Sequence, residues 1–411
     1  MSILTTKLLK RVASLSTGTT PSTKSASYYD SEDVDWYSPG DINTDSIYPN
    51  TPAKKISNLY FEENSIPLYK AGSVAIVGIG ATVGKIAYID HDFFTNQQLN
   101  VLRFNKDINP KYAAYFLFNK KEEIISTTPS VTLPILNQTK LGQLTFIYPP
   151  LSEQDRIVSY LDSKTSEIDQ AISLLERKRE AYTRLKASVI NRAVTRGLNP
   201  NVKLKDSGVA WIGKIPEGWE VKRLKSIFTE SKAVSSTGKE DLLSVSEYYG
   251  VAKRVDKMED GEYISRAETL VGYKKCKKDD LVINIMLAWK RGLGFSDYDG
   301  IVSPSYAVYR GKNIVPHYFH YLLRTNMYIA EFKRNSKGII DSRLRLYTDR
   351  FNNIKAVVPP LPEQRSIASY LDAECSKIDR AASIVEKQID AYKRLKRSLI
   401  NEVVTGKRTK F

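Results

Sequence analysis

The sequence predicts an α+β protein in which two globular regions alternate with two long helices. The helices are expected to pack as an antiparallel coiled coil with a pseudo-twofold internal repeat. Residues 149–196 align without a gap on residues 359–406, with 26 of 48 positions identical. Both segments carry apolar residues at seven-residue spacing, the pattern typical of paired helices. Because a repeat of this length makes two equivalent modules, the target of the chain is also expected to have two parts.

Four segments follow from the repeat. In order they are a globular region, a helical region, a second globular region and a second helical region: residues 1–148, 149–197, 198–358 and 359–411. Each globular region contains short strand-like runs, glycine turns and a helix that begins at a proline, Pro110 or Pro316. This mixture predicts the α+β class. The repeat continues faintly inside the globular regions, since residues 9–12 resemble residues 224–227.

The two helical segments have recognisable ends. Ser152 is a candidate N-cap, Pro362 suits a first helical turn, and Gly197 and Gly406 are expected stops. About 43 residues at 1.5 Å each give a rod of roughly 65 Å. The predicted seam between the helices consists of one residue per heptad in each copy: Leu161, Ile168, Leu175, Tyr182 and Val189, and then Leu371, Ile378, Val385, Tyr392 and Leu399.

The charge of the chain indicates a polyanionic partner. The 411 residues include 62 Lys and Arg against 46 Asp and Glu, a net charge of +16. Residues 201–358 alone contain 28 Lys and Arg against 19 Asp and Glu. A basic surface attracts nucleic acid because contact with phosphates releases counterions. Double-stranded DNA is therefore the expected partner, with an acidic protein partner or a simple gain in solubility as the alternatives.

Compartment and membrane signals are sparse. No run of 18 apolar residues predicts a membrane helix, and the apolar stretch at the start is too short for a secretory signal. The basic, Ser- and Thr-rich start leaves a transit peptide open. The two cysteines, Cys276 and Cys375, lie in different modules, which favours a reduced cytoplasmic setting and no membrane partner.

Residues that could read DNA are basic or carry amides, because these groups pair with guanine edges, adenine edges or phosphates. The candidates in the second globular region are Lys290, Arg291, Lys337, Arg343, Arg345 and Tyr347. Those in the first are Lys85, Lys111 and the two amides Asn96 and Gln97. The alternative for each is a solvated surface cation or a turn-capping amide.

Catalytic motifs are missing. The run Gly78-Ile79-Gly80-Ala81-Thr82-Val83-Gly84-Lys85 resembles a phosphate loop but fits neither glycine pattern, so a tight strand-turn-strand is expected. His317 and His320 lack a third metal ligand nearby in sequence. The Pro-Pro pairs follow Tyr148 and Val358 rather than the Asn or Asp that base methylation requires. The chain is expected to be no enzyme by itself and to hold no metal or cofactor.

The pattern PPLxEQxxIxxYLD…ID…AYxRLKxSxIN…VT, placed after each globular region, and the phrase spanning Trp211 to Glu220 resemble the DNA-specificity (S) subunit of type I restriction-modification systems. The resemblance implies two target recognition domains, a central and a distal conserved helix that pack antiparallel, and two methyltransferase (M) subunits as partners. Restriction (R) subunits join for cleavage. S-adenosylmethionine, ATP and Mg²⁺ are then expected in the partner subunits. The chain has no N-terminal counterpart of the Trp211 phrase, which leaves open whether the start is complete.

This resemblance implies recognition of two short DNA sequences separated by a fixed, unread spacer. A rod of roughly 65 Å covers nearly two turns of B-DNA, so the helices would set the spacer. The outer faces of the helices are expected to carry Glu153, Gln154, Glu363 and Gln364. These residues are candidates for docking of the methyltransferase, and the alternative is that they only keep the helices soluble. The alternative function is a stand-alone two-headed DNA-binding regulator.

Overall fold

The computed structural model describes residues 4–31, 33–66, 68–126, 134–254 and 269–409. It divides the chain into two compact units that do not coincide with the four sequence segments. Unit 1 comprises residues 1–177 and 386–411, and unit 2 comprises residues 178–385. Each unit therefore contains one globular region together with a part of both long helices.

In unit 1, a four-stranded antiparallel sheet has the strand order β2-β8-β5-β6. Two smaller sheets, β1-β9 and β4-β3-β7, complete the β-structure. The strands are β1 (Thr5–Leu8), β2 (Ala13–Thr17), β3 (Val34–Tyr37), β4 (Lys54–Ile56), β5 (Ser73–Val77), β6 (Ile86–Ile89), β7 (Phe94–Thr95), β8 (Leu99–Phe104) and β9 (Thr145–Tyr148). The short helices are η1 (Leu9–Arg11), η2 (Ala26–Tyr28), α1 (Asn58–Asn64), α2 (Pro110–Asn119), α3 (Lys121–Ser126) and α4 (Gln138–Gly142).

Unit 2 repeats this plan with the sheet β13-β20-β17-β18 and four two-stranded pairs, β10-β11, β12-β21, β14-β15 and β16-β19. Its strands are β10 (Leu204–Asp206), β11 (Lys214–Pro216), β12 (Glu220–Arg223), β13 (Phe228–Glu230), β14 (Leu243–Ser246), β15 (Gly250–Lys253), β16 (Lys274–Cys276), β17 (Leu281–Asn284), β18 (Leu293–Phe295), β19 (Gly300–Val302), β20 (Tyr306–Gly311) and β21 (Lys355–Val358). Its short helices are α6 (Leu224–Ile227), η4 (Ala288–Lys290), α7 (Pro316–Leu323), α8 (Asn326–Asn335), η5 (Asp341–Arg343) and α9 (Thr348–Asn353).

The internal repeat extends through the globular regions, as the weak sequence matches predict. In each unit, one early strand pairs antiparallel with the last strand before the long helix, β1 with β9 and β12 with β21. A single helical turn then follows, η1 or α6, and the central sheets have the same order. The glycine-rich run after β5 forms the expected strand-turn-strand, because β5 and β6 are adjacent antiparallel strands.

The two long helices are α5 (Leu151–Arg196) and α10 (Leu361–Val404). The predicted stops are confirmed, since Gly197 and Gly406 have φ values of 75° and 72°, the left-handed conformation that terminates helices. Pro362 lies in the first turn of α10, as expected. The Ser152 cap is wrong: α5 already begins at Leu151, and the carbonyl of Pro150 accepts the first helical hydrogen bonds.

The predicted seam is largely inside the protein. Leu161, Ile168, Leu371, Ile378, Val385 and Leu399 are buried, and Leu175, Tyr182 and Val189 are half-buried. Tyr392 is wrong, because 37% of its surface is exposed. Ile389 and Lys396 are buried in that stretch of α10 instead. A strict seven-residue count marks one position per heptad, and in this stretch the buried positions lie three residues before and four residues after Tyr392.

A buried glutamine at the start of each long helix attaches the proline-started helix of the same unit. In unit 1, Gln154 Oε1 accepts the N–H of Asn109 at 2.8 Å, and its Nε2 donates to the carbonyls of Asp107 and Pro149. In unit 2, Gln364 accepts the N–H of Val315 at 3.0 Å and donates to the carbonyl of Pro359 at 2.8 Å. We call Gln154 and Gln364 the glutamine clamps. Each one satisfies backbone groups that would otherwise be buried without partners.

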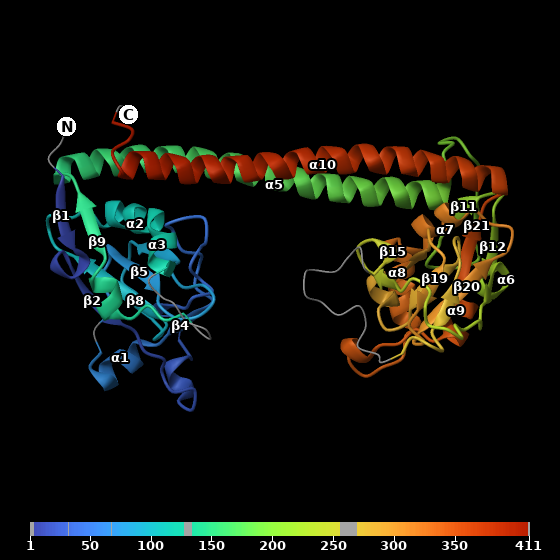
Figure 1. Ribbon diagram of the computed structural model, residues 1–411, viewed down its shortest axis with the longest axis horizontal. Helices are drawn as coiled ribbons and strands as arrows, with labels where there is room; N and C mark the ends of the chain where they lie inside the picture. Colours follow the sequence, from blue (N-terminus) through green and yellow to red (C-terminus); the bar gives the residue numbers. More distant parts are fainter. Residues whose placement is uncertain (1–3, 32, 67, 127–133, 255–268, 410–411) are drawn as a thin grey trace. The chain divides into compact units, whose positions relative to one another are not determined.

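A carboxylate two turns further along each helix reinforces the attachment. Asp162 accepts the hydroxyl of Tyr115 at 2.8 Å, and Asp372 accepts the hydroxyl of Tyr321 at 2.8 Å. Figure 1 shows α2 and α7 lying between the long helices and the sheet of their own unit. Residues that are identical in the two copies of the repeat therefore join each globular region to its helix segments.

Removal of a glutamine clamp is expected to destabilise its unit. Gln364→Ala leaves the Val315 N–H and the Pro359 carbonyl buried without partners, which should cost about 2 to 4 kcal/mol in the free energy of unfolding. The exposed Gln388→Ala in the same helix is the matched control and should change stability by less than about 0.5 kcal/mol. Urea unfolding of both variants checks this, and equal stabilities would contradict the role of the clamp.

Candidate nucleic-acid interface

Four of the DNA-reading candidates lie close together in unit 2, three of them on one loop and the fourth two residues after it. Lys337 and Arg345 form an isolated antiparallel bridge, with both backbone hydrogen bonds at 2.9 Å. This bridge closes residues 338–344 into a protruding loop, which we call the 337–345 loop. Lys337, Arg343 and Tyr347 are exposed, and Arg345 is half-buried. The structure thus brings Lys337, Arg343, Arg345 and Tyr347 to one part of the surface, and their contact with DNA stays a prediction.

A tryptophan connects this loop to a fifth candidate. The ammonium of Lys290 lies 5.0 Å from the Trp289 ring centroid, and that of Lys333 lies 5.2 Å from it. Lys333 also forms an ion pair with Asp341 in the loop at 2.9 Å. We call the exposed cations Lys290 on η4, Lys333 on α8, and Lys337 and Arg343 on the loop the basic surface of unit 2. The sequence did not single out Trp289 or Lys333. The cation–π contact between them in the structure identifies both as part of this region.

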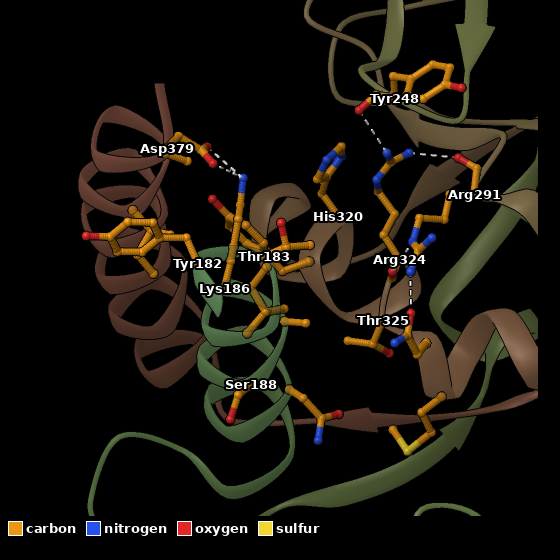
Figure 2. Close-up of a pocket in the computed structure, with 18 residues that line it drawn as sticks. Tyr182, Thr183, Lys186, Ser188, Tyr248, Arg291, His320, Arg324, Thr325 and Asp379 are labelled. Atoms are coloured by element: carbon orange, nitrogen blue, oxygen red, sulfur yellow. Dashed lines mark hydrogen bonds and ion pairs between the residues drawn. The ribbon is translucent and has the colours of Figure 1, made fainter. Parts of the chain in front are cut away.

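A cavity of about 850 Å³ lies in the same unit, between the helix segments and α7 and α8. Figure 2 shows Lys186 paired with Asp379 on one side, Arg291, Arg324 and Tyr248 on the other, and His320 between them. Burial lowers the pKa of His320 to about 4, so its imidazole is neutral at ordinary pH. The wall formed by Arg291 and Arg324 therefore dominates the local charge.

Arg324 and Arg291 build this wall through backbone contacts. Arg324 donates hydrogen bonds to the carbonyls of Arg291, Leu293, Glu247 and Tyr248 at 2.6–3.3 Å. Burial lowers the pKa of Arg324 to about 10, and the neighbouring Arg291 adds to this shift. Arg291 donates to the carbonyl of Arg324 and to Asn326 Oδ1. Arg291 thus has internal contacts although it is half-buried, and its contact with DNA stays a prediction.

The candidates in unit 1 are tied to their own globular region. Asn96 is buried and builds the turn before β8 by accepting the N–H of Gln98, which is the turn-capping alternative. Lys111 forms an ion pair with Asp162 at 2.9 Å and lies over the rings of two tyrosines. Burial lowers the pKa of Lys111, but the Asp162 carboxylate and Tyr48 outweigh it and raise that pKa. Asn96 and Lys111 are corrected to structural residues.

The other two candidates of unit 1 have one internal contact each. Lys85 donates to the carbonyl of Ile42 at 3.1 Å and is half-buried. Gln97 is exposed and accepts a hydrogen bond from the hydroxyl of Thr20. Contact of Lys85 and Gln97 with DNA remains a prediction.

The expected partner-docking residues mostly face inward. The clamps Gln154 and Gln364 are 0% and 1% exposed, so they cannot form an outer face. Glu363 accepts the indole N–H of Trp219 at 2.8 Å, which explains why the Trp211 to Glu220 phrase accompanies the repeat. These three predictions are wrong, because the residues hold the fold of each unit together. Glu153 pairs with Arg156 at 3.0 Å and is still a candidate.

The described part of the chain shows no group of three or more His, Cys, Asp or Glu that could hold a metal ion. Within the same residues, no helix has the length and apolarity that a bilayer crossing requires.

Comparison with known proteins identifies relatives of one kind. The model of the type I restriction modification DNA specificity domain matches the chain twice, at residues 4–177 and 216–389. Two specificity subunits of type I restriction enzymes from Methanocaldococcus jannaschii are similar: MjaX, a provisional designation, and MjaVIII. They are 28% and 24% identical, over 79% and 80% of this chain and 75% and 77% of their own length. The EcoKI specificity subunit of Escherichia coli K12 is 20% identical over 48% of this chain and 45% of its own.

A solved structure supports the fold. A chain from work on complex assembly and conformational transition of a type I R-M system superposes with a TM-score of 0.69. The superposition covers 98% of this chain and 97% of that chain at 14% sequence identity.

Alanine at both Arg343 and Arg345 is expected to weaken binding of the target DNA. Loss of a base-contacting arginine costs about 1 to 3 kcal/mol, and loss of a phosphate contact lowers the salt dependence of binding by about one counterion. Titration of the full chain with its partner methyltransferase against duplex DNA at several salt concentrations measures both. The control is the double variant Lys205→Ala and Lys214→Ala in the β10-β11 hairpin. Unchanged affinity and unchanged sequence preference would remove Arg343 and Arg345 from the interface.

Proposed function

The chain belongs to the type I restriction modification DNA specificity family, and we propose that it is the subunit that selects the DNA sequence for a type I restriction-modification complex. Two copies of the family's domain in one chain fit a target with two separate parts. Each part would be read by one unit. Membership of this family favours this function over that of a stand-alone DNA-binding regulator.

The observation that carries the proposal is the match between sequence repeat and structure. Both family matches contain a sheet of the same strand order, a proline-started helix and a glutamine clamp. The basic surface of unit 2, with Lys290, Lys333, Lys337 and Arg343, is the strongest DNA-facing candidate.

The long helices would pair as an antiparallel coiled coil. In unit 1, Lys396 contacts Asp169 at 2.7 Å, and in unit 2, Lys186 contacts Asp379 at 2.6 Å. Asp379 and Lys396 lie 210 residues after Asp169 and Lys186, so the same ion pair recurs with the helices running in opposite directions. A single antiparallel register is consistent with both contacts. In the proposal this register sets the length of the unread spacer.

The specificity family is named for recognition, and this chain is a non-catalytic subunit. Association with methyltransferase and restriction subunits follows from this role. We further propose two methyltransferase subunits, one for each half of the target, which would bring S-adenosylmethionine. ATP and Mg²⁺ would enter with the restriction subunit, and the cytoplasm is the proposed compartment. Of the predicted docking residues, Glu153 is the one that remains available for a partner.

Exchange of the two charges in the ion pair between Lys396 and Asp169 tests the antiparallel pairing. The Lys396 side chain is 5% exposed, so Lys396→Asp should destabilise unit 1 by about 2 to 4 kcal/mol, and the added change Asp169→Lys should recover most of this loss. Lys186→Asp is the matched control, because the equivalent pair is 35% and 58% exposed and should matter by less than about 1 kcal/mol. Denaturant unfolding measures each variant. Failure of the double variant to recover stability would argue against the register.

Mapping of methylated adenines tests the function itself. The full chain is co-expressed with the methyltransferase encoded beside it, and the modified sites in the host DNA are sequenced. Two short motifs separated by a constant number of unread base pairs are the expected result. A single continuous motif would contradict the proposal, as would methyl transfer by the purified chain without a partner.

A further inference from the structure

The tip of the 337–345 loop is apolar and open to solvent. Ile339 is 99% exposed and Ile340 is 53% exposed. The Ile339 side chain makes almost no packing contact within the chain and Ile340 is about half exposed, so the pair leaves apolar surface in water, which is unfavourable. Together with the charges around it, such a pair at the end of a loop is a candidate interaction site.

The loop holds this tip in a defined position. The Lys337–Arg345 bridge closes its base with two hydrogen bonds of 2.9 Å. Gly338 has a φ of 154°, and a Cβ at that position would lie 2.6 Å from the carbonyl oxygen of Arg343, so only glycine fits. Asp341 is fixed by Lys333 at 2.9 Å. Ile339 is thus presented from a built loop, which reduces the conformational entropy lost on binding.

Positive charge surrounds the apolar tip. Lys337 and Arg343 have exposed side chains, and within the described residues neither forms an ion pair. Arg345 directs its guanidinium to the carbonyls of Ser342 and Leu344. The one carboxylate of the loop, Asp341, is neutralised by Lys333. The occupant of this surface must therefore offer negative charge around an apolar centre.

We propose that Ile339 is a base-contacting residue that enters a groove of the target duplex while Lys337 and Arg343 contact the phosphates on either side. The inference rests on the proposed function and adds to it the residue that reads DNA without hydrogen bonds. Bases offer the required apolar surface in two ways, through the thymine methyl group in the major groove or through base faces exposed by unstacking. Duplex DNA is favoured over a protein partner, because its phosphates supply negative charge on both sides of a groove, where Lys337 and Arg343 would otherwise lose water without compensation.

Duplex DNA of the mapped target sequence is the probe for this inference. The full chain in complex with its methyltransferase is compared with Ile339→Ala, and Leu198→Ala serves as control because Leu198 is an exposed apolar residue outside the loop. Ile339→Ala should weaken binding about tenfold, with the dependence on salt unchanged because no charge is removed. Since the Ile339 side chain touches little of its own chain, the variant should fold as the wild type does. Equal affinity of the wild type and Ile339→Ala would overturn the proposal.

Modified duplexes separate the two modes of contact. Deoxyuridine in place of each thymine of the half-site removes the methyl group, and 2-aminopurine in place of adenine reports unstacking by increased fluorescence. With wild-type chain, one of these two responses is expected, and Ile339→Ala should abolish it. The proposal fails if neither duplex responds, or if the response persists in Ile339→Ala. A wild-type complex that recognises no two-part target would instead overturn the proposed function on which the inference rests.

Discussion

The buried hydrogen bonds of Gln154 and Gln364 are the constraint on which the rest of the structure depends. Each side chain receives a backbone N–H from the start of the proline-started helix and returns a donor to the proline carbonyl before the long helix. These contacts use the amide in both of its hydrogen-bonding roles, which neither a carboxylate nor a longer cation can do. A glutamine at this position therefore fixes the direction in which a globular region leaves its long helix.

The clamps also divide each unit into a structural framework and a part that can contact DNA. The clamped part of each unit contains the long helices, the proline-started helix and the strand that precedes the long helix. The 337–345 loop and η4 lie outside it and can vary without loss of the clamp contacts. Such a division suits a protein that must keep one geometry for its partners while it reads different DNA sequences.

The framework could be predicted from the sequence, because helix pairing leaves a strong periodic signal. The length of both helices, their glycine stops and the repeat inside the globular regions were all readable. Tyr392 was misplaced because a strict seven-residue count marks one position per heptad, whereas Ile389 and Lys396 occupy the buried positions in that stretch of α10. Gln154, Gln364 and Glu363 were assigned to the surface, since a polar residue in a helix carries no sequence mark that distinguishes a buried clamp from a solvated side chain.

The candidate site was less predictable, because it depends on contacts between residues distant in sequence. Lys337, Arg343 and Arg345 were identified by residue type and proximity in the chain, and the loop brings them together. Lys111 and Arg291 were chosen for the same charge, but Asp162 and the carbonyl of Arg324 take up that charge inside the protein. Ile339 and Trp289 could not be found, since an isolated apolar residue in a sequence predicts a core position.

The most direct test of this account is an exchange of one globular region in which Gln364 and both long helices stay, and the incoming segment supplies the proline-started helix that Gln364 contacts. Residues 220–358 are replaced by the equivalent segment of a family relative, and the methylated motif is mapped for the hybrid chain with the same methyltransferase. If the units read independently from a common framework, one half of the motif changes while the other half and the spacer stay the same. A change in both halves, or in the spacer with both halves retained, would contradict the account.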